Sequence, residues 1–274
     1  MDLHGKTILI TGSTDGVGRW VARRLAADGA HVLLHGRSEE RGRAVLEAIQ
    51  AEGGSAEFLP ADLSSLAEVR RLAEAVLARH DRLDVLINNA GIGTGPDPDR
   101  RETSADGHEL RFAVNYLAGF LLTRLLLPAL RRSAPARIVN VASAGQQAID
   151  FDDVMLTRGY SGIRAYCQSK LAQILFTFDL AEELRGSGVT ATCLHPATYM
   201  DTTMVRQSGT HPISTVEEGG EAILALAVSP EREGENGVYY SGQRPARPLA
   251  QAEDPVAREK LRRLSAQLTG LEPG

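Results

Sequence analysis

Short runs of apolar and β-branched residues alternate with longer amphipathic segments along most of the chain. The expected strands are residues 6–11, 31–35, 56–60, 85–88, 137–142, 190–195 and 238–240. The expected helices are residues 17–28, 39–52, 65–79, 108–130, 165–185 and 216–228. Strands separated by single helices require crossover connections, which make neighbouring strands parallel and cover both faces of the sheet with helices. The alternation therefore predicts an α/β fold: a single-domain, Rossmann-type, doubly wound parallel sheet of about seven strands flanked by helices.

The chain shows no point at which it would divide into domains. Its 274 residues contain no internal repeat, low-complexity tract or linker, and this length suits one large α/β domain. Hydrophobic residues make up 43% of the chain and charged residues 24%, as in ordinary globular proteins. We therefore expect a single domain over residues 1–274.

Charge and cysteine content argue against several classes of function. The formal net charge is −5 and no long Lys/Arg cluster is present, so a nucleic-acid partner is not expected. Cys167 and Cys193 are too few for a disulfide framework and form no metal-ligand pattern. No metal site is therefore predicted.

The same sequence gives no indication of export or membrane insertion. The chain starts almost directly with the first predicted strand, which leaves no room for a signal peptide. The most apolar stretch, residues 119–130, is broken by Arg124 and is short for a bilayer span. These features predict a cytoplasmic protein without a membrane span.

A glycine-rich turn follows the first predicted strand and leads directly into the first predicted helix. Glycines allow a tight turn and a close approach of the backbone to a pyrophosphate, while the helix N-terminus offers free N–H groups to phosphates. A glycine-rich turn alone is often only a tight loop, but its position here is the one that dinucleotide binding requires. The predicted cofactor-binding residues of this turn are Gly12, Ser13, Thr14, Asp15, Gly16, Val17 and Gly18.

The residues after the second predicted strand favour NADP over NAD. An acidic side chain would be expected here to bind the 2′-hydroxyl of the NAD ribose, but the chain has Gly36 followed by Arg37. A guanidinium can bind a 2′-phosphate through charge-assisted hydrogen bonds. In the alternative interpretation, Arg37 is solvated and the site takes NAD. Asp15 adds no support for NADP.

Asp62 and Leu63 follow the third predicted strand. The carboxylate of Asp62 could accept a hydrogen bond from the amino group of an adenine. It could equally be a loop acid near a helix start, and the spacing does not separate these two interpretations.

Tyr166 and Lys170 lie one helical turn apart in an apolar segment, so their side chains share one face. A phenol has an unperturbed pKa of about 10. A neighbouring ammonium favours the phenolate and so brings this pKa closer to neutral, where proton transfer is efficient. On its own, such a pair is usually a solvated surface pair.

Several motifs occur in one order along the chain: TGSTDGVG, DL, NNAG, the Asn of VNYLAG, the Ser of NVASAG, and YCQSK. In this order and spacing the chain resembles the short-chain dehydrogenase/reductase family from residue 6 to about residue 205. The long segment 144–165, the sequence YCQSKLAQILFTFDLAEEL and a following His-Pro resemble the retinol-dehydrogenase-like branch and its bacterial relatives. This resemblance names a sequence branch and does not identify retinol as the substrate.

The resemblance implies roles for four residues. Tyr166 would be the general acid/base, and Lys170 would lower the Tyr166 pKa and hold the nicotinamide ribose. Ser143 would bind the substrate oxygen and Asn115 would hold a water that links Lys170 to solvent. The chemistry would be hydride transfer between the nicotinamide and an alcohol or carbonyl substrate. Taken singly, Ser143 could be a strand-end turn residue and Asn115 an ordinary helix-interior residue.

The resemblance also extends the cofactor site to Asn89, Ala90 and Gly91 of NNAG, and to Pro196 and Thr202. The family usually has Pro-Gly after the sixth strand and a Thr that contacts the carboxamide, but here Ala197 replaces the Gly and the Thr comes about one residue late. Residues 197–214 are predicted to form a substrate lid, the alternative being a plain surface loop.

Two other functional classes share these features. A catalytically silent NADP-binding sensor or regulator would use the same fold, but binding alone does not require Tyr166, Lys170 and Ser143 together. An epimerase or dehydratase of the extended branch shares the Tyr–Lys pair, but little chain remains after Val205 for the larger substrate domain of those proteins. Family members often form homodimers or homotetramers, and the helical faces do not decide between these states.

Overall fold

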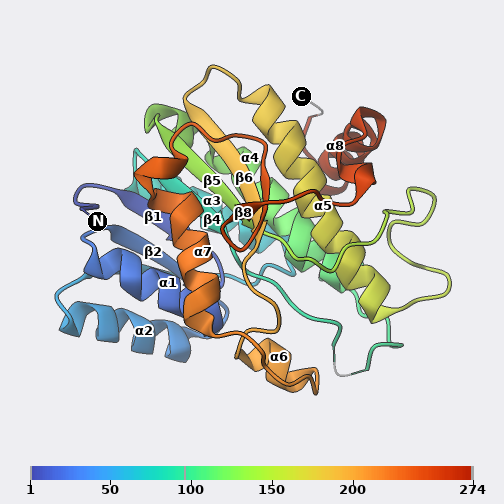
Figure 1. Cartoon of the computed structure of the whole chain (residues 1–274), viewed down its shortest axis with the longest axis horizontal. Coiled ribbons are helices and arrows are strands. Elements are labelled where there is room, and N and C mark those ends of the chain that lie inside the picture. The colour runs from blue at the N-terminus through green and yellow to red at the C-terminus, as the bar shows by residue number, and fades with distance from the viewer. Residues whose placement is uncertain (1, 96, 273–274) are drawn as a thin grey trace.

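Eight strands form one sheet in the order β3-β2-β1-β4-β5-β6-β7-β8 in the computed structural model, which describes residues 2–95 and 97–272 (Figure 1). The strands are β1 (Thr7–Ile10), β2 (His31–Gly36), β3 (Ser55–Pro60), β4 (Val85–Asn88), β5 (Ala136–Val141), β6 (Val189–His195), β7 (Tyr239–Ser241) and β8 (Arg244–Pro245). All neighbouring strands are parallel except β7 and β8, which are antiparallel. The order reverses between β1 and β4, which opens a crevice at their carboxyl ends.

Helices connect these strands and cover the sheet on both faces (Figure 1). The α-helices are α1 (Gly16–Ala27), α2 (Glu39–Ala51), α3 (Leu66–Arg79), α4 (Ala118–Arg132), α5 (Gly162–Glu183), α6 (Thr203–Gln207), α7 (Val216–Val228) and α8 (Pro255–Thr269). A π-helical segment, η1 (Phe112–Leu117), precedes α4, and two short 3₁₀ helices are η2 (Pro230–Arg232) and η3 (Ala250–Ala252).

The two faces of the sheet carry separate apolar cores, because successive residues of a strand point to opposite sides. Ile8 and Ile10 belong to the core under α1 and α7. Leu9 and Leu33 belong to the larger core under α3, α4 and α5. α1 and α7 can approach closely because Gly220 on α7 has no side chain. A Cβ atom there would overlap the Trp20 ring on α1. The two helices lie beside each other in Figure 1.

All seven predicted strands and all six predicted helices are present, with ends that differ by a few residues. The sequence analysis missed α6, α8 and the short antiparallel strand β8. α8 had recognisable end signals: Asp254 caps it through Val256 N, Pro255 is its first residue, and Gly270 ends it with φ +64. Its apolar residues are sparse, because only one stripe of the helix packs against α5.

The helix that contains the most apolar stretch extends beyond residues 119–130. Phe112–Arg132 forms a continuous helical segment of 21 residues that contains an 18-residue window with a mean hydropathy of 1.5. By length and composition it could cross a bilayer, so the expectation that this stretch is too short does not hold by itself. Of this window, 72% is buried inside the protein, which is the situation of a core helix. Arg131 and Arg132 lie in its last turn, where they complement the helix dipole.

Replacing Gly18 tests how closely the first helix packs against the glycine-rich turn. A Cβ atom there would overlap the Gly12 carbonyl oxygen and the Asn89 amide nitrogen. We expect Gly18→Ala to lower the free energy of unfolding by about 1–3 kcal/mol, since overpacking outweighs the better helix propensity of Ala. Urea denaturation measures this change. Arg19→Ala, at the next and exposed position, should stay within about 0.5 kcal/mol, and equal stability of both variants would contradict the close approach.

Candidate active site

The predicted site residues converge at the carboxyl ends of the parallel strands. The glycine-rich turn follows β1, Arg37 follows β2, Asp62 follows β3, and Asn89 follows β4. Ser143 comes shortly after β5 and the segment with Pro196 after β6, while Tyr166 and Lys170 lie on α5. In a parallel sheet these strand ends share one edge, where ligands of doubly wound folds bind.

The glycine-rich turn has the backbone geometry that a phosphate site needs. Gly12 and Gly16 have φ of +66 and +50, a region that side chains with a Cβ atom rarely adopt. Asp15 is the N-cap of α1 and accepts a hydrogen bond from Gly16 N at 2.7 Å. The turn therefore directs the N-terminus of α1 toward the crevice between β1 and β4.

His35, on β2, holds this turn in place, and the sequence analysis did not identify it. Its Nδ1 accepts a hydrogen bond from Gly12 N at 3.1 Å, and its Nε2 lies 3.2 Å from the Ala61 carbonyl. Burial lowers the pKa of His35 to about 4, so the ring is neutral and carries its proton on Nε2. A histidine within an otherwise apolar buried strand was the signal available in the sequence.

The NNAG segment braces the turn from the other side. Asn89 Nδ2 donates to the carbonyl oxygens of Thr11 and Gly12 at 2.9 and 3.1 Å. The Thr11 hydroxyl accepts from the backbone N–H groups of Asn89 and Ala90, both at 3.0 Å. Ala90 also approaches Gly12 so closely that a Cβ atom at Gly12 would lie 2.8 Å from the Ala90 Cα. Asn89 and Ala90 thus shape the predicted cofactor site.

The end of β2 carries a glycine, Gly36, and an exposed arginine, Arg37. A Cβ atom at Gly36 would lie 2.7 Å from the Thr14 hydroxyl, so Gly36 allows the glycine-rich turn to pass close by. Arg37 is exposed, and among the described residues its guanidinium has neither an ion-pair nor a hydrogen-bond partner. This guanidinium is therefore available to an anionic ligand.

Asp62 and Leu63 are held at the end of β3 by their neighbours. Asp62 Oδ1 accepts from Ser64 N at 2.9 Å, and Asp62 N donates to Glu68 Oε2 at 2.6 Å. Ser65 Oγ accepts from Glu68 N at 3.4 Å as the N-cap of α3, so Glu68 completes only half of a capping box. Leu63 is buried. The carboxylate of Asp62 therefore has a local role in the loop, and its contact with an adenine stays a prediction.

Ser143 and Tyr166 meet after β5. The Ser143 hydroxyl accepts from Gly145 N at 3.0 Å. Burial raises the pKa of Tyr166 above its ordinary value, and a hydrogen bond with Ser143 partly opposes this rise. The negative charge of a phenolate is costly in this partly buried position. A Cβ atom at Gly145 would lie 3.5 Å from the Ser143 hydroxyl and 3.6 Å from the Tyr166 ring, so Gly145 lies next to both side chains.

Lys170 lies deep beside Tyr166, with its Nζ 5.8 Å from the centre of the phenol ring. Its Nζ donates to the Val141 carbonyl at 2.9 Å and to Gln173 Oε1 at 3.0 Å. Burial lowers the pKa of Lys170 to about 7. Lys170 is not among the groups that shift the pKa of Tyr166, so its predicted lowering of that pKa stays a prediction. The sequence analysis missed Gln173, one turn after Lys170 on the same helix face.

Asn115 lies in η1, the π-helical segment before α4. Its Oδ1 accepts from Ile92 N at 2.8 Å, while its Nδ2 donates to Ile92 O at 3.1 Å and to Ser169 Oγ at 2.9 Å. A Cβ atom at Gly91 would lie 3.4 Å from Asn115 Oδ1 and 3.5 Å from Lys170 Nζ. Asn115 therefore ties the chain after β4 to α5 next to Lys170. The water predicted at Asn115 stays a prediction.

The segment after β6 crosses the mouth of this crevice. Pro196 is buried, and residues 197–214 include α6. Thr202 caps α6 through Val205 N, and its side chain lies beside Gly16. The Thr203 hydroxyl donates to Asp15 Oδ2 at 2.8 Å, so the predicted lid touches the glycine-rich turn. The lid's movement stays a prediction.

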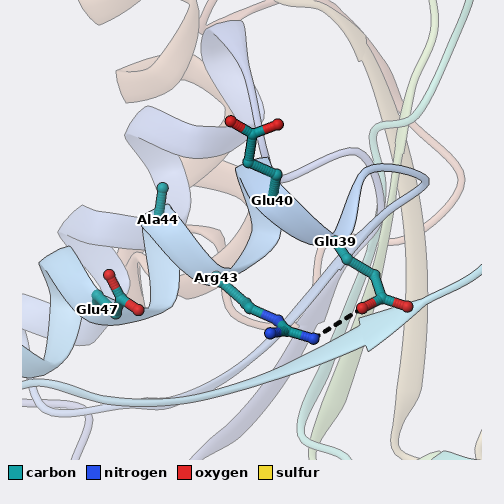
Figure 2. A pocket seen from close by; sticks show the side chains of 5 residues that line it. All are labelled: Glu39, Glu40, Arg43, Ala44 and Glu47. Atoms are coloured by element: carbon teal, nitrogen blue, oxygen red, sulfur yellow. Dashed lines mark hydrogen bonds and ion pairs between the residues drawn. The ribbon is translucent and has the colours of Figure 1, made fainter.

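Two surface hollows lie outside the catalytic candidates, and the second of them borders the glycine-rich turn. The hollow in Figure 2 is lined by one exposed helix, α2, where Glu39 pairs with Arg43 at 2.8 Å and Glu40 points away. A second hollow, of about 500 Å³, lies between α1 and α6 and includes Asp15 and Thr202 in its lining. Neither hollow is lined by the catalytic candidates.

Comparison with known proteins shows similarity in sequence and fold over nearly the whole chain. The model of the short chain dehydrogenase family matches residues 6–212. Human retinol dehydrogenase 13 is 38% identical, over 98% of this chain and 86% of its own length. A solved structure of an uncharacterized protein from Mycobacterium paratuberculosis has a TM-score of 0.83 and 32% identity, covering 100% of this chain and 96% of that one.

A second similar structure is a complex with NADP. The RhlG/NADP active-site complex of Pseudomonas aeruginosa has a TM-score of 0.72 and 30% sequence identity. It covers 88% of this chain and 95% of its own. That protein is therefore similar in both fold and sequence over most of this chain.

The buried Lys170 predicts a specific dependence of stability on pH. Because its pKa is lowered from 10.5 to about 7, the unfolded chain binds more protons than the folded one between these values. The destabilising contribution of Lys170 is thus largest below pH 7 and fades as pH rises. Relative to Lys170→Met, wild-type stability should increase by on the order of 1–4 kcal/mol between pH 7 and pH 10.

Urea denaturation of both proteins at several pH values measures this difference. Taking the difference removes the contributions of other titrating groups that both proteins share. A difference that does not change with pH would contradict the buried, poorly charged state of Lys170.

Proposed function

The chain belongs to the short-chain dehydrogenase/reductase family, in its retinol-dehydrogenase-like branch, and from this premise we propose that it is an NADP-dependent oxidoreductase. It transfers a hydride between the nicotinamide and an alcohol or carbonyl substrate, with Tyr166 as general acid/base. The observation that carries this proposal is the convergence of Ser143, Tyr166 and Lys170, with Lys170 beside Gly91 of the NNAG segment that braces the glycine-rich turn. A protein that only bound a dinucleotide would not need these three groups around one point.

The residues at the crevice fit a phosphorylated dinucleotide. Gly12 and Gly16, with positive φ, and the N-terminus of α1 would hold the pyrophosphate. The guanidinium of Arg37, which has no partner among the described residues, supports the choice of NADP, because it can bind the 2′-phosphate by charge-assisted hydrogen bonds. The similarity to a structure described as an NADP complex adds to this choice. When bound, the dinucleotide would supply or accept the hydride.

The protein's own groups move and hold the proton at the substrate oxygen. Tyr166 gives its phenolic proton to a carbonyl oxygen in reduction and takes a proton from a hydroxyl in oxidation. Ser143 hydrogen-bonds the same oxygen and stabilises the charge that develops there. Lys170, with a pKa of about 7, can gain or lose a proton near neutral pH, so it is suited to restore the protonation state of Tyr166 through Asn115 and solvent.

The wider setting belongs to the same proposal. We take the partner to be a small alcohol or carbonyl compound, with residues 197–214 closing over it as a lid. The buried state of the apolar helix 112–132 supports a cytoplasmic protein without a membrane span. The net charge of −5 supports the absence of a nucleic-acid partner. We also expect a homodimer or homotetramer, because members of this family often form such oligomers.

Removing the phenolic hydroxyl tests the acid/base role. Tyr166→Phe should lower kcat for NADPH-dependent reduction of carbonyl compounds by about 10²–10⁴-fold, since proton donation is lost while binding remains. NADPH oxidation with a panel of aldehydes and ketones measures this loss. Tyr160→Phe removes a different hydroxyl, one bonded to Glu109, and should keep the activity. If NADPH binds but no carbonyl is reduced faster than by Tyr166→Phe, the protein is a binding protein and not an enzyme.

Reversing the charge of Arg37 tests the cofactor. Arg37→Asp should reduce the NADPH over NADH preference in kcat/KM by about 10–100-fold, because an acid repels the 2′-phosphate and can bind a ribose hydroxyl. Arg43→Asp makes the same charge change on the exposed face of α2 and should leave the preference unchanged. An unaltered preference in Arg37→Asp would mean that another group selects the cofactor.

A further inference from the structure

Two histidines and one glutamate meet far from the predicted active site. His31 begins β2, Glu57 lies on β3, and His80 follows the last residue of α3. His31 pairs with Ser55 and Leu33 with Glu57 in the β2–β3 register, so His31 and Glu57 point to the same face of the sheet. Leu33 places this face under α3. His31 and His80 therefore lie toward the amino ends of the strands, opposite the end that carries Tyr166.

The three side chains are close enough to share one cation. Each offers one ligand atom, and these atoms lie within 4.8 Å of one another. His80 Nε2 is 3.2 Å from Glu57 Oε2, and the two imidazole rings are 5.5 Å apart between centroids. Around a tetrahedral Zn²⁺ with bonds of about 2.0 Å, neighbouring ligand atoms are about 3.3 Å apart. The three ligand atoms would have to move closer together by on the order of 1 Å, through side-chain rotation, to reach this spacing.

A neighbouring hydroxyl already orients one imidazole. His31 Nδ1 lies 2.7 Å from Ser55 Oγ. When Nδ1 carries the proton and donates to Ser55, the lone pair of Nε2 is free to bind a metal. This second contact is typical of metal-binding histidines, whose other nitrogen is held by a polar neighbour.

The nearby charges leave a carboxylate oxygen for the ion. Arg79 pairs with Glu57 Oε1, which leaves Oε2 facing His80. The positive charge of Arg79 lies beside the proposed site. The same charge would weaken the attraction of a dication, so the site depends on its two imidazoles more than on net negative charge.

We propose that His31, Glu57 and His80 form a binding site for a divalent transition cation of the Zn²⁺ type. Two imidazoles and one carboxylate suit Zn²⁺, Co²⁺ and Ni²⁺, whereas Mg²⁺ and Ca²⁺ prefer oxygen ligands. Three protein ligands leave a fourth position for water. The bound ion connects β2, β3 and the end of α3, and therefore stabilises this edge of the fold without taking part in the reaction. The sequence predicted no metal site because the three residues are distant along the chain.

Zinc binding by the untagged, full-length protein tests this proposal. After treatment with a chelator and its removal, titration with ZnCl₂ against a chromogenic zinc indicator should give one Zn²⁺ per chain. At about ten times its Kd, Zn²⁺ should raise the midpoint of thermal unfolding by roughly 3 °C. MgCl₂ should give no rise. His31→Ala and His80→Ala should each weaken Zn²⁺ binding at least 10-fold, and Glu57→Gln should weaken it less.

Matched controls separate the site from general effects. His4→Ala removes an exposed histidine that is bonded to Asp2, and it should bind Zn²⁺ like the wild type. Circular dichroism without metal checks that the His31 and His80 variants are folded. Co²⁺ added to the wild type gives an independent measurement, because its visible absorption reports a four-coordinate nitrogen and oxygen site.

Two outcomes would overturn the proposal. One is the absence of stoichiometric Zn²⁺ binding and of a Co²⁺ spectrum in the wild type. The other is Zn²⁺ binding that persists unchanged in a folded His31→Ala or His80→Ala variant. Neither measurement uses NADPH or substrate, so the result is independent of the proposed oxidoreductase function.

Discussion

The reversal of strand order between β1 and β4 is the constraint on which the site depends. All strands but β8 are parallel, so their carboxyl ends share one edge, and connections that leave β1 and β4 in opposite directions open a crevice there. The close approach of Gly18 to the Gly12 carbonyl holds the first turn against this crevice. Asn89 and His35 then fix the turn from both sides. The sheet topology therefore produces the crevice at this edge, whichever side chains line it.

A buried chain of polar side chains connects the sheet to α5, the helix that carries Tyr166 and Lys170. Asn88 donates to Asn140 at 2.9 Å, Asn140 donates to Thr177 at 2.9 Å, and Thr177 donates to the Gln173 carbonyl at 2.7 Å. The Gln173 side chain in turn accepts from Lys170. Because buried polar groups are costly without partners, this chain fixes the register of α5 against β4 and β5. It explains how an apolar helix can carry an ammonium into the core.

Much of the fold could be predicted from local patterns, because period and turn chemistry are local properties. The strands and the helices with one clear apolar stripe follow this rule. α6 and β8 are too short to show a period. The site was predicted as a set of motifs, yet His35 was missed because its role depends on Gly12 and Ala61, which are distant in the chain. Gln173 lies only one helical turn from Lys170, but its residue type and spacing do not show that the two side chains turn toward each other in the core.

The amino-acid sequence by itself determined the α/β class, the family, and the identity of the groups at the crevice, because each of these is written in residue types and their spacing. The tertiary structure alone decided the state of those groups. Burial depends on neighbours from the whole chain, and it is burial that raises the pKa of Tyr166 and lowers that of Lys170 to about 7. It likewise decided that His31, Glu57 and His80 share one point in space, because only the pairing of β2 with β3 and the end of α3 bring them together.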